Sequence, residues 1–354
     1  MEKGALEFNI KPRLGALLLP FFRSQLFVTP RIPQQSFAGQ TVVITGANSG
    51  LGLEAACHFF RLHVAKLILA VRSTDKGQAA KEEIVKRIRS RSDGDTAIEV
   101  WTVDVGTTES TLAFAERVKE ELPRVDVLLC NAGVNPRRYE LVEGYELSMQ
   151  INVFNTFLLA LSLLPKLNDT KRQFPDTSPH LVIVGSDACR LTKFVEINSP
   201  DIYEAFNDES TFDGQARYQD SKLIQVLVHR EIVSRLEAGT GPSPVTFNVV
   251  HPGLCVSNIF QNFGNYSLGT RIVHKLLFRT AEVGSRTLVD AACKGPRSHG
   301  RFLADTEPVE LDAWISTDMG NKAQKKTFEQ TMKILESRRP GIAAQAGIRI
   351  RPTL

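Results

Sequence analysis

Seven short apolar runs alternate with helical patterns along this chain, and a glycine-rich segment follows the first run. Regular alternation of strand and helix favours crossover connections, which place the strands parallel in one sheet with helices on both faces. The sequence therefore predicts an α/β fold with a doubly wound, seven-stranded parallel sheet.

The expected strands are apolar and rich in β-branched residues, as buried parallel strands are. They cover residues 41–45, 66–71, 97–103, 125–130, 180–185, 244–250 and 301–304. Helical patterns cover 50–62, 74–90, 107–121, 145–166, 214–237 and 322–337. We expect a Rossmann-type catalytic domain at 39–310, an N-terminal arm at 1–38, and a C-terminal helix and tail at 311–354.

The composition is that of an ordinary globular protein. Of 354 residues, 42% are hydrophobic and 23% charged, and the formal net charge is only +4. A mild charge without a basic stripe argues against a nucleic acid partner. The five cysteines are scattered without C-x-x-C spacing, and the histidines show no ligand pairing. We therefore expect a reducing compartment, no disulfide framework and no metal site.

The N-terminal arm carries an apolar segment, LGALLLPFF at 14–22. Such a segment, interrupted by Pro20 and followed by Arg23, is too short to cross a bilayer, which takes about 20 residues. Acidic residues nearby and the lack of a small-residue cleavage site argue against a secretory signal. Two interpretations stay open: the segment packs across the body of the protein, or residues 14–28 anchor it on a membrane surface. We expect a cytoplasmic protein, peripheral to a membrane in the second case.

A phosphate-binding turn is predicted where TGANSGLG at 45–52 joins the first strand to the first helix. Glycine lets backbone N–H groups approach a pyrophosphate closely, and the N-terminus of a helix attracts the anion. Gly46, Gly50 and Gly52 read G-x-x-x-G-x-G instead of the standard G-x-G-x-x-G, and either pattern alone is a weak signal.

The end of the second expected strand indicates which dinucleotide binds. An acidic residue about 20 positions after the glycines holds the ribose 2′-hydroxyl of NAD, whereas an arginine suits the 2′-phosphate of NADP. Arg72 stands at that distance from Gly52, so NADP(H) is the expected cofactor. The alternative is an exposed strand-end arginine without a role. Asp104 is expected to accept from the adenine amino group or to cap the following helix.

The reactive group is predicted in the helix that contains Tyr218 and Lys222. Residues four apart share one helical face, where an ammonium can lower the pKa of a phenol toward a value useful for proton transfer. Ser186 follows the fifth expected strand, at the edge of the sheet where ligands bind. It can hydrogen-bond a carbonyl oxygen that Tyr218 protonates.

These motifs together resemble a short-chain dehydrogenase/reductase of the single-domain type over residues 39–310. The family's marks occur in order: TGANSGLG at 45–52, Asp104, Asn131-Ala132-Gly133, Asn152, Ser186, Tyr218 with Lys222, and Pro252-Gly253. The resemblance implies that Asn152 positions a water in a proton relay with Lys222, which also binds the nicotinamide ribose. The residues expected to contact the cofactor are Gly46, Asn48, Ser49, Gly50, Leu51, Gly52, Arg72, Asp104, Val105, Asn131, Ala132, Gly133, Tyr218, Lys222, Pro252 and Gly253.

A narrower likeness rests on SQLFVTP, LAVR, RYQDSKL and GSRTLV. These segments are similar to the retinol-dehydrogenase-like branch and to fungal reductases of secondary-metabolite pathways. We therefore expect an NADPH-dependent reductase or alcohol dehydrogenase acting on the C=O or CH–OH group of a hydrophobic, polyketide-like substrate. The alternatives are a membrane-associated retinoid or steroid reductase, a non-redox cyclase and an NADP-sensing protein.

Two features bear on the substrate pocket and on assembly. The insertion between Ser186 and Tyr218 is expected to form one pocket wall, and a lid near 254–280 the other; packing in a satellite core is the alternative. The aromatic and apolar residues concerned are Phe194, Tyr203, Phe206, Phe212, Leu254, Ile259, Phe260 and Phe263. The expected helix at 150–164 is apolar on nearly all sides, so a homodimer is predicted through it.

Overall fold

The computed structural model describes residues 7–12, 14–240, 243–256 and 277–349, and it is built around one eight-stranded sheet. The strand order is β10-β9-β8-β7-β4-β1-β2-β3. The strands are β1 (Thr41–Thr45), β2 (Lys66–Val71), β3 (Ile98–Thr102), β4 (Val127–Cys130), β7 (His180–Val184), β8 (Thr246–His251), β9 (Phe302–Ala304) and β10 (Glu307–Val309). All neighbours pair in parallel except β10 with β9. The doubly wound α/β fold is confirmed.

The eighth strand corrects the prediction of a seven-stranded, fully parallel sheet. Asp305 and Thr306 both have positive φ (53° and 70°), and they join β9 to β10 in a two-residue hairpin. Tight hairpins need this left-handed backbone and usually obtain it from Asn-Gly or Asp-Gly. The sequence Asp-Thr gave no such signal, so the strand beyond residue 304 was missed.

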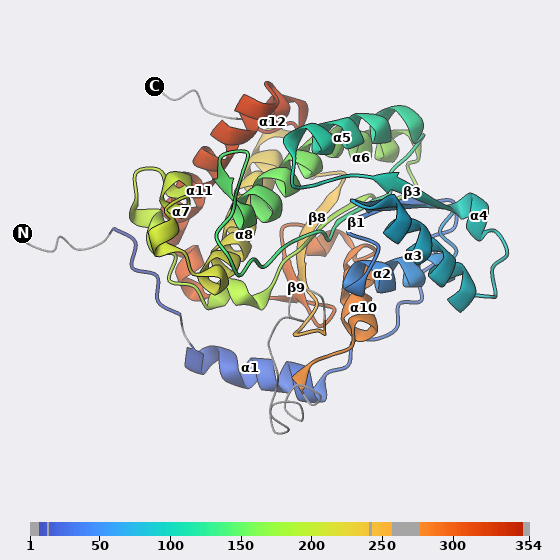
Figure 1. The fold of residues 1–354 in the computed structure, drawn as a ribbon, viewed down its shortest axis with the longest axis horizontal. Helices are drawn as coiled ribbons and strands as arrows, with labels where there is room; N and C mark the ends of the chain where they lie inside the picture. The colour runs from blue at the N-terminus through green and yellow to red at the C-terminus, as the bar shows by residue number, and fades with distance from the viewer. Residues whose placement is uncertain (1–6, 13, 241–242, 257–276, 350–354) are drawn as a thin grey trace, which may run out of the picture.

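Helices cover both faces of the sheet (Figure 1). On one face lie α2 (Gly50–Arg61), α3 (Thr74–Arg87) and α10 (Ala281–Ala291). On the other lie α5 (Thr108–Glu121), α6 (Thr156–Gln173) and α8 (Gly214–Thr240). The shorter helical segments are α4 (Gly94–Ala97), η2 (Asp187–Arg190), η3 (Val195–Asn198), α7 (Ile202–Phe206), η4 (Glu209–Thr211), η5 (Pro296–Ser298) and η6 (Ala313–Ser316).

The helix expected at 145–166 has a different structure at its start. A small hairpin, β5 (Leu141–Val142) with β6 (Tyr145–Glu146), comes first, and a π-helix, η1 (Met149–Asn155), then leads into α6. The hairpin turn uses Glu143 and Gly144, both at positive φ. π-helical turns are rare and often occur at functional sites. Asn152 lies in this one.

The many apolar sides of α6 are covered within the chain itself. α6 packs on the sheet, on α5 and on α12 (Ile342–Gln345), and Arg339 donates to Ser162 on α6 at 3.3 Å. Its leucines from 158 to 167 are buried without a second copy. The apolar pattern of α6 therefore gives no reason for a dimer, and the homodimer stays a prediction.

The two ends of the chain pack at different places. α1 (Leu14–Phe27) lies at the lower edge of the molecule in Figure 1, below β9 and α10, and α11 (Asp318–Arg338) packs against α8. Arg279 fixes the end of α1: it donates to the carbonyl oxygens of Ser24 (2.7 Å) and Val28 (3.0 Å) and pairs with Asp305. None of the described helices combines the length and apolar character needed to cross a bilayer.

Candidate active site

The glycine segment forms a tight turn between β1 and α2. Gly46 and Gly50 have positive φ (66° and 54°), and α2 begins at Gly50. A Cβ atom on Gly52 would lie only 2.4 Å from the Gly46 carbonyl oxygen and 2.6 Å from Asn131 Nδ2. The turn can therefore close only with glycine at these positions, and it directs the first N–H groups of α2 toward the sheet edge.

A cavity of about 320 Å³ opens beside this turn; we refer to it as the glycine-loop cavity. Fifteen of the sixteen residues expected to contact the cofactor line it: Gly46, Asn48, Ser49, Gly50, Leu51, Arg72, Asp104, Val105, Asn131, Ala132, Gly133, Tyr218, Lys222, Pro252 and Gly253. Gly52 is the exception. It lies behind the turn, where its lack of a side chain allows Gly46 to approach.

Arg72 and Asp104 lie on the wall of the glycine-loop cavity. Arg72 is exposed at the end of β2. Asp104 Oδ1 accepts from the Gly106 backbone N–H at 2.8 Å and so shapes the loop before α5. The cap of α5 itself is Thr107, whose side chain accepts from Ser110 N–H, so the alternative role of Asp104 as the helix cap is wrong.

Tyr218, Ser186 and Lys222 meet at the carboxyl end of β7. Burial raises the pKa of Tyr218 to about 12, and the interaction of Tyr218 with the Ser186 side chain lowers that pKa in part. Lys222 Nζ lies 5.7 Å from the centre of the Tyr218 ring. Burial lowers the pKa of Lys222 to about 7. The structure therefore places a hydroxyl pair and a buried amine around one point.

Asn152 is connected to these three residues by hydrogen bonds to other side chains of α8. Its side chain accepts from the Val134 N–H and donates to the Val134 carbonyl and to Ser221 Oγ, each at 2.9 Å. Its backbone carbonyl accepts from Gln225 Nε2 at 2.6 Å. Gln225 was missed from the sequence, although it stands three positions after Lys222 and so faces the same side of the helix.

The π-helix that carries Asn152 is also held from the C-terminal helix α11. Arg338, the last residue of α11, donates to Asn155 Oδ1 (3.0 Å) and Gln150 Oε1 (2.7 Å), both in η1. Gln150 in turn donates to the Gly106 carbonyl at 3.0 Å. The π-helix that carries Asn152 is thus connected to both α11 and the loop before α5.

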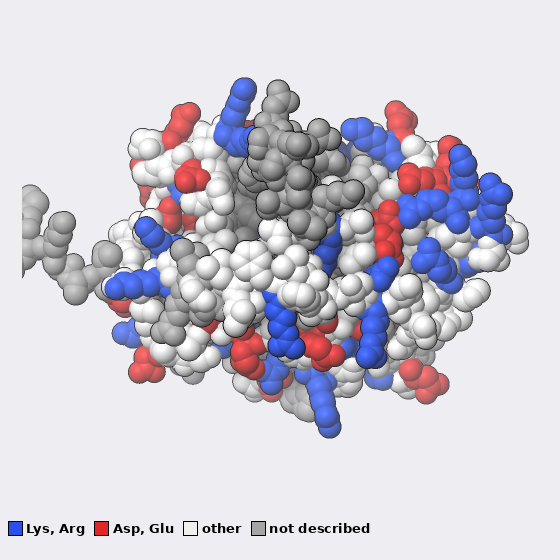
Figure 2. Space-filling view, turned by 90° about the horizontal axis from the view of Figure 1, so that it is seen from below, with Lys and Arg blue, Asp and Glu red and all other residues white. Residues whose placement is uncertain are grey.

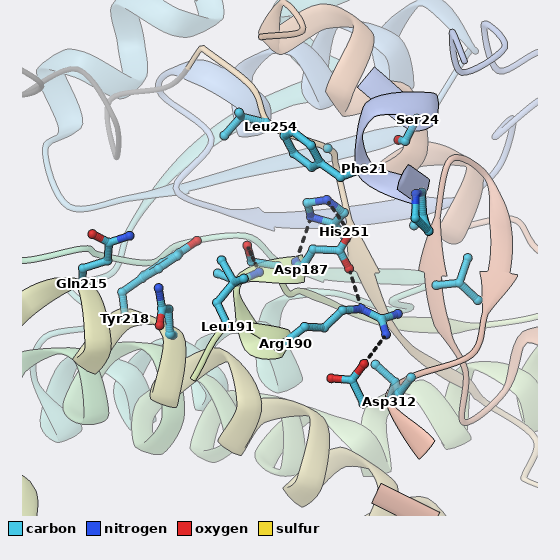
Figure 3. Close-up of a pocket in the computed structure, with 18 of the residues that line it drawn as sticks. Phe21, Ser24, Asp187, Arg190, Leu191, Gln215, Tyr218, His251, Leu254 and Asp312 are labelled. Atoms are coloured by element: carbon cyan, nitrogen blue, oxygen red, sulfur yellow. Dashed lines mark hydrogen bonds and ion pairs between the residues drawn. The ribbon is translucent and has the colours of Figure 1, made fainter. Parts of the chain in front are cut away.

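A second and larger cavity, of about 1080 Å³, adjoins the first; we refer to it as the α1 cavity. Its lining comes from α1, η2, the start of α8, the loop at 135–137 and the segment 304–313. Tyr218 and Gln215 lie on one side of it, on α8, and Phe21 and Ser24 on the other, on α1 (Figure 3). One face of α1 thus packs on the body of the protein, as the first interpretation of the apolar N-terminal segment expects, and the membrane-surface interpretation stays a prediction.

The expected aromatic wall of this cavity is wrong. Phe194, Tyr203 and Phe206 are buried in the core beside α11 and η1, where Tyr203 packs edge-to-face on Phe154 and its hydroxyl bonds to Thr331. Phe212 packs against Tyr139 and does not line the cavity. Among the expected lid residues, Leu254 lines the α1 cavity, and Ile259, Phe260 and Phe263 lie outside the described residues.

The floor of the α1 cavity carries a polar cluster that sequence analysis also missed. Asp187 pairs with Arg190 (3.2 Å) and faces His251, while Arg190 also pairs with Asp312 (3.3 Å), as Figure 3 shows. Burial lowers the pKa of His251. Asp187 directly follows Ser186 and His251 ends β8, so their place at strand ends was the available signal.

Comparison with known proteins identifies the family. A family model described as short chain dehydrogenase matches residues 40–195. A short chain dehydrogenase/reductase of Cryptosporiopsis sp., dmxR8, is 39% identical over 92% of this chain and 99% of its own length. A short-chain dehydrogenase of Penicillium roqueforti, anuD, is 37% identical over 92% of this chain and 84% of its own length.

Solved structures share the fold at lower identity. The RhlG/NADP active-site complex of Pseudomonas aeruginosa is 19% identical, covers 77% of this chain and 97% of that chain, and has a TM-score of 0.57. A putative short chain dehydrogenase from Escherichia coli complexed with NADPH is 19% identical, covers 78% and 100%, and has a TM-score of 0.57. With full-length relatives well above 30% identity, this chain belongs to the short-chain dehydrogenase/reductase family of oxidoreductases.

Proposed function

We propose that the protein is an NADPH-dependent ketoreductase or alcohol dehydrogenase that uses Tyr218 as its acid and base. The observation that carries this proposal is the position of four residues that line both cavities: Ser186, Tyr218, His251 and Gly253. A cofactor in the glycine-loop cavity and a substrate in the α1 cavity would meet there. The hydroxyl groups of Ser186 and Tyr218 both belong to this junction.

The glycine-loop cavity fits a dinucleotide phosphate. Gly46 and Gly50 hold the left-handed backbone that exposes N–H groups, and a Cβ at Gly52 would clash with the Gly46 carbonyl and force the turn open. Arg72, exposed on the cavity wall, can pair with a 2′-phosphate and supports NADP(H) over NAD(H). Lys222 and the 131–133 segment would hold the ribose.

In the reduction, bound NADPH supplies a hydride to the substrate carbon. Ser186 and Tyr218 donate hydrogen bonds to the carbonyl oxygen and polarise it. Tyr218 then gives its proton to that oxygen. Since burial raises the pKa of Tyr218 to about 12, the resulting phenolate needs a nearby cation, and the Lys222 ammonium is 5.7 Å from the ring. In the reverse direction the phenolate accepts the proton of the alcohol.

The lining of the α1 cavity suits a mainly hydrophobic substrate that also carries polar groups. Its apolar lining includes Leu18, Phe21, Leu191, Leu254 and Leu311, and its polar floor is Asp187 with Arg190. A volume of about 1080 Å³ exceeds what a small alcohol would fill. Together with the fungal relatives, this lining supports a polyketide-like carbonyl of a secondary-metabolite pathway as the substrate class.

The test is oxidation of NADPH and NADH by the purified protein with a panel of aromatic, polyketide-like, steroid and retinoid carbonyls. We expect turnover with NADPH that falls by more than about 1000-fold in Tyr218→Phe, since the proton donor is lost. Tyr203→Phe is the matched control, because Tyr203 is a buried tyrosine bonded to Thr331 and lines neither cavity. Cofactor binding without oxidation of any carbonyl would favour the cyclase or the NADP-sensing protein.

A second candidate, a membrane-associated reductase, is favoured by the outer face of α1. Leu19, Phe22 and Phe27 are 78%, 40% and 81% exposed. Figure 2 views the molecule from the side of α1 and shows an uncharged area bordered by charged side chains. Pelleting with phospholipid vesicles tests this, and Leu19→Gln with Phe27→Gln should abolish it. Wild-type protein that stays in the supernatant would argue against the membrane contact.

A further inference from the structure

The buried Lys222 amine is held by an amide. Lys222 Nζ donates to the Val184 carbonyl at 2.9 Å and to Gln225 Oε1 at 3.1 Å. Gln225 is only 1% exposed, and its Nε2 donates to the Asn152 carbonyl at 2.6 Å. One side chain therefore connects the lysine of α8 to the backbone of η1.

The connection is built from both sides. Ser221 and Gln225, one turn apart on α8, hold the side chain and the backbone carbonyl of the same residue, Asn152. Ser221 Oγ also donates to the Tyr218 carbonyl at 2.8 Å. The π-helical turn places Asn152 where both contacts form, and Arg338 holds that turn from behind.

The groups around Lys222 make its contact with the Gln225 amide important for the stability of the ammonium. The ionisable groups that interact with Lys222 are Tyr218 on its own helix and Cys189 on η2. Burial raises the pKa of both groups, so each is neutral at pH 7. Within the described residues, no carboxylate takes part in the interactions of Lys222. The cation therefore depends on carbonyl dipoles, which act strongly in a buried site.

We propose that Gln225 is a positioning residue of the active site, whose amide carbonyl fixes the Lys222 ammonium beneath Tyr218 and whose amide NH₂ anchors it to Asn152. The family resemblance implied a water in the link between Asn152 and Lys222; here the Gln225 side chain makes that link directly. A side-chain amide does not gain or lose a proton near neutral pH. Gln225 therefore positions the Lys222 ammonium and does not pass a proton from it to Asn152. The position of Gln225 does not depend on the proposed function, but its expected effect on turnover rests on that function.

The first test needs no turnover. Lysines labelled with ¹³C at Cε are titrated by NMR in cofactor-free protein, and the Lys222 signal is assigned by its loss in Lys222→Met. Gln225→Met keeps the volume and removes both the acceptor and the donor, so the pKa of Lys222 should fall by about one unit. Gln225→Ala leaves room for a water to replace the acceptor and should shift the pKa less.

Gln324→Met is the matched control. Gln324 is a buried glutamine on α11 that bonds to Glu231 and Arg230, and it lines neither cavity. We expect it to leave the pKa of Lys222 unchanged. If Gln225→Met does not fold, Gln225→Asn retains an amide one methylene shorter, and a smaller fall in the pKa of Lys222 is then expected.

The second test measures kcat against pH for reduction. The limb that reports Lys222 should shift to lower pH by about one unit in Gln225→Met and by less in Gln225→Ala. An unchanged pKa of Lys222 in Gln225→Met would overturn the proposal. A larger fall in the pKa of Lys222 in Gln225→Ala than in Gln225→Met would also overturn it, because that result would show that Gln225 only fills space. Absence of turnover in the wild type would contradict the proposed function while the NMR titration still decides the role of Gln225.

Discussion

The two cavities differ in how the chain builds them. The glycine-loop cavity is lined by short motifs at the ends of neighbouring strands, such as residues 48–51 and 131–134. The α1 cavity is assembled from segments as far apart in sequence as α1 and residues 304–313. The first depends on backbone geometry that residue types determine locally, whereas the second depends on how distant elements pack.

The catalytic group lies where the two cavities join, and it shares features of both. Tyr218, Lys222 and Gln225 share one helix, but Asn152 and Ser186 reach them only through tertiary packing. Substitutions that act on one cavity and not on the other can therefore test whether cofactor binding and substrate binding are separable.

The largest effect is expected from Gly52→Ala, which attacks the local geometry of the glycine-loop cavity. The new Cβ would lie 2.4 Å from the backbone oxygen of Gly46, so the turn must open. We expect NADPH affinity to fall by more than about 100-fold, equivalent to about 3 kcal/mol, together with a lower Tm. Fluorescence titration with NADPH measures it.

Gly295→Ala is the control for this substitution. Gly295 has a φ of −61°, and a Cβ there would meet nothing within 4 Å. It should leave NADPH affinity and Tm unchanged. If Gly52→Ala bound NADPH as tightly as the wild type, the turn would tolerate a side chain at this position. The close approach of Gly46 would then not explain why residue 52 is glycine.

Arg72→Ala should change which cofactor is used without changing the cavity. Loss of a charge-assisted contact to the 2′-phosphate should weaken NADPH binding by about 10- to 100-fold and leave NADH binding almost unchanged. Arg89→Ala, at an exposed arginine after α3 that does not line the cavity, is the comparison. Equal losses for NADPH and NADH would contradict a 2′-phosphate contact.

The sequence could predict the features that residue types determine locally, but not those that depend on the packing of distant elements. All seven expected strands exist, and fifteen residues expected at the cofactor line one cavity, because glycine turns and strand ends leave local signals. The wall of Phe194, Tyr203 and Phe206 was wrong because an apolar run does not show whether it faces a cavity or the core. The roles of Phe21 and Gln225 depend on contacts across the fold, which one sequence does not encode locally.

Phe21→Ala should affect the α1 cavity alone. Phe21 lines this cavity and is absent from the lining of the other. Loss of its apolar contact should raise the KM for the carbonyl substrate by about 10-fold and leave the Kd for NADPH unchanged. Phe22→Ala, at the adjacent outward-facing ring, should leave both constants unchanged. A rise in the NADPH Kd for Phe21→Ala would show that the two cavities are coupled.

The smallest effect on ligand binding is expected from Asp220→Asn, on the side of α8 opposite Tyr218. Burial, with the nearby charge of Glu196, raises the pKa of Asp220 from 3.8 to about 8, and its carboxyl accepts from Thr192. Between these pH values the folded protein keeps a proton that the unfolded chain releases, so stability falls as pH rises from about 4 to about 8.

Asparagine copies the protonated carboxyl and does not titrate. Asp220→Asn should therefore match the wild-type Tm near pH 4 and exceed it by several degrees at pH 8, where the wild type has lost the stabilisation that the protonated carboxyl provides. Asp95→Asn, at a side chain that is 98% exposed, should show no such pH-dependent gain. A Tm difference that does not change with pH would mean that Asp220 acts through packing and not through its proton. Because Asp220 lines neither cavity, NADPH affinity and substrate KM should both stay at wild-type values, which separates the stability of α8 from the chemistry on its other face.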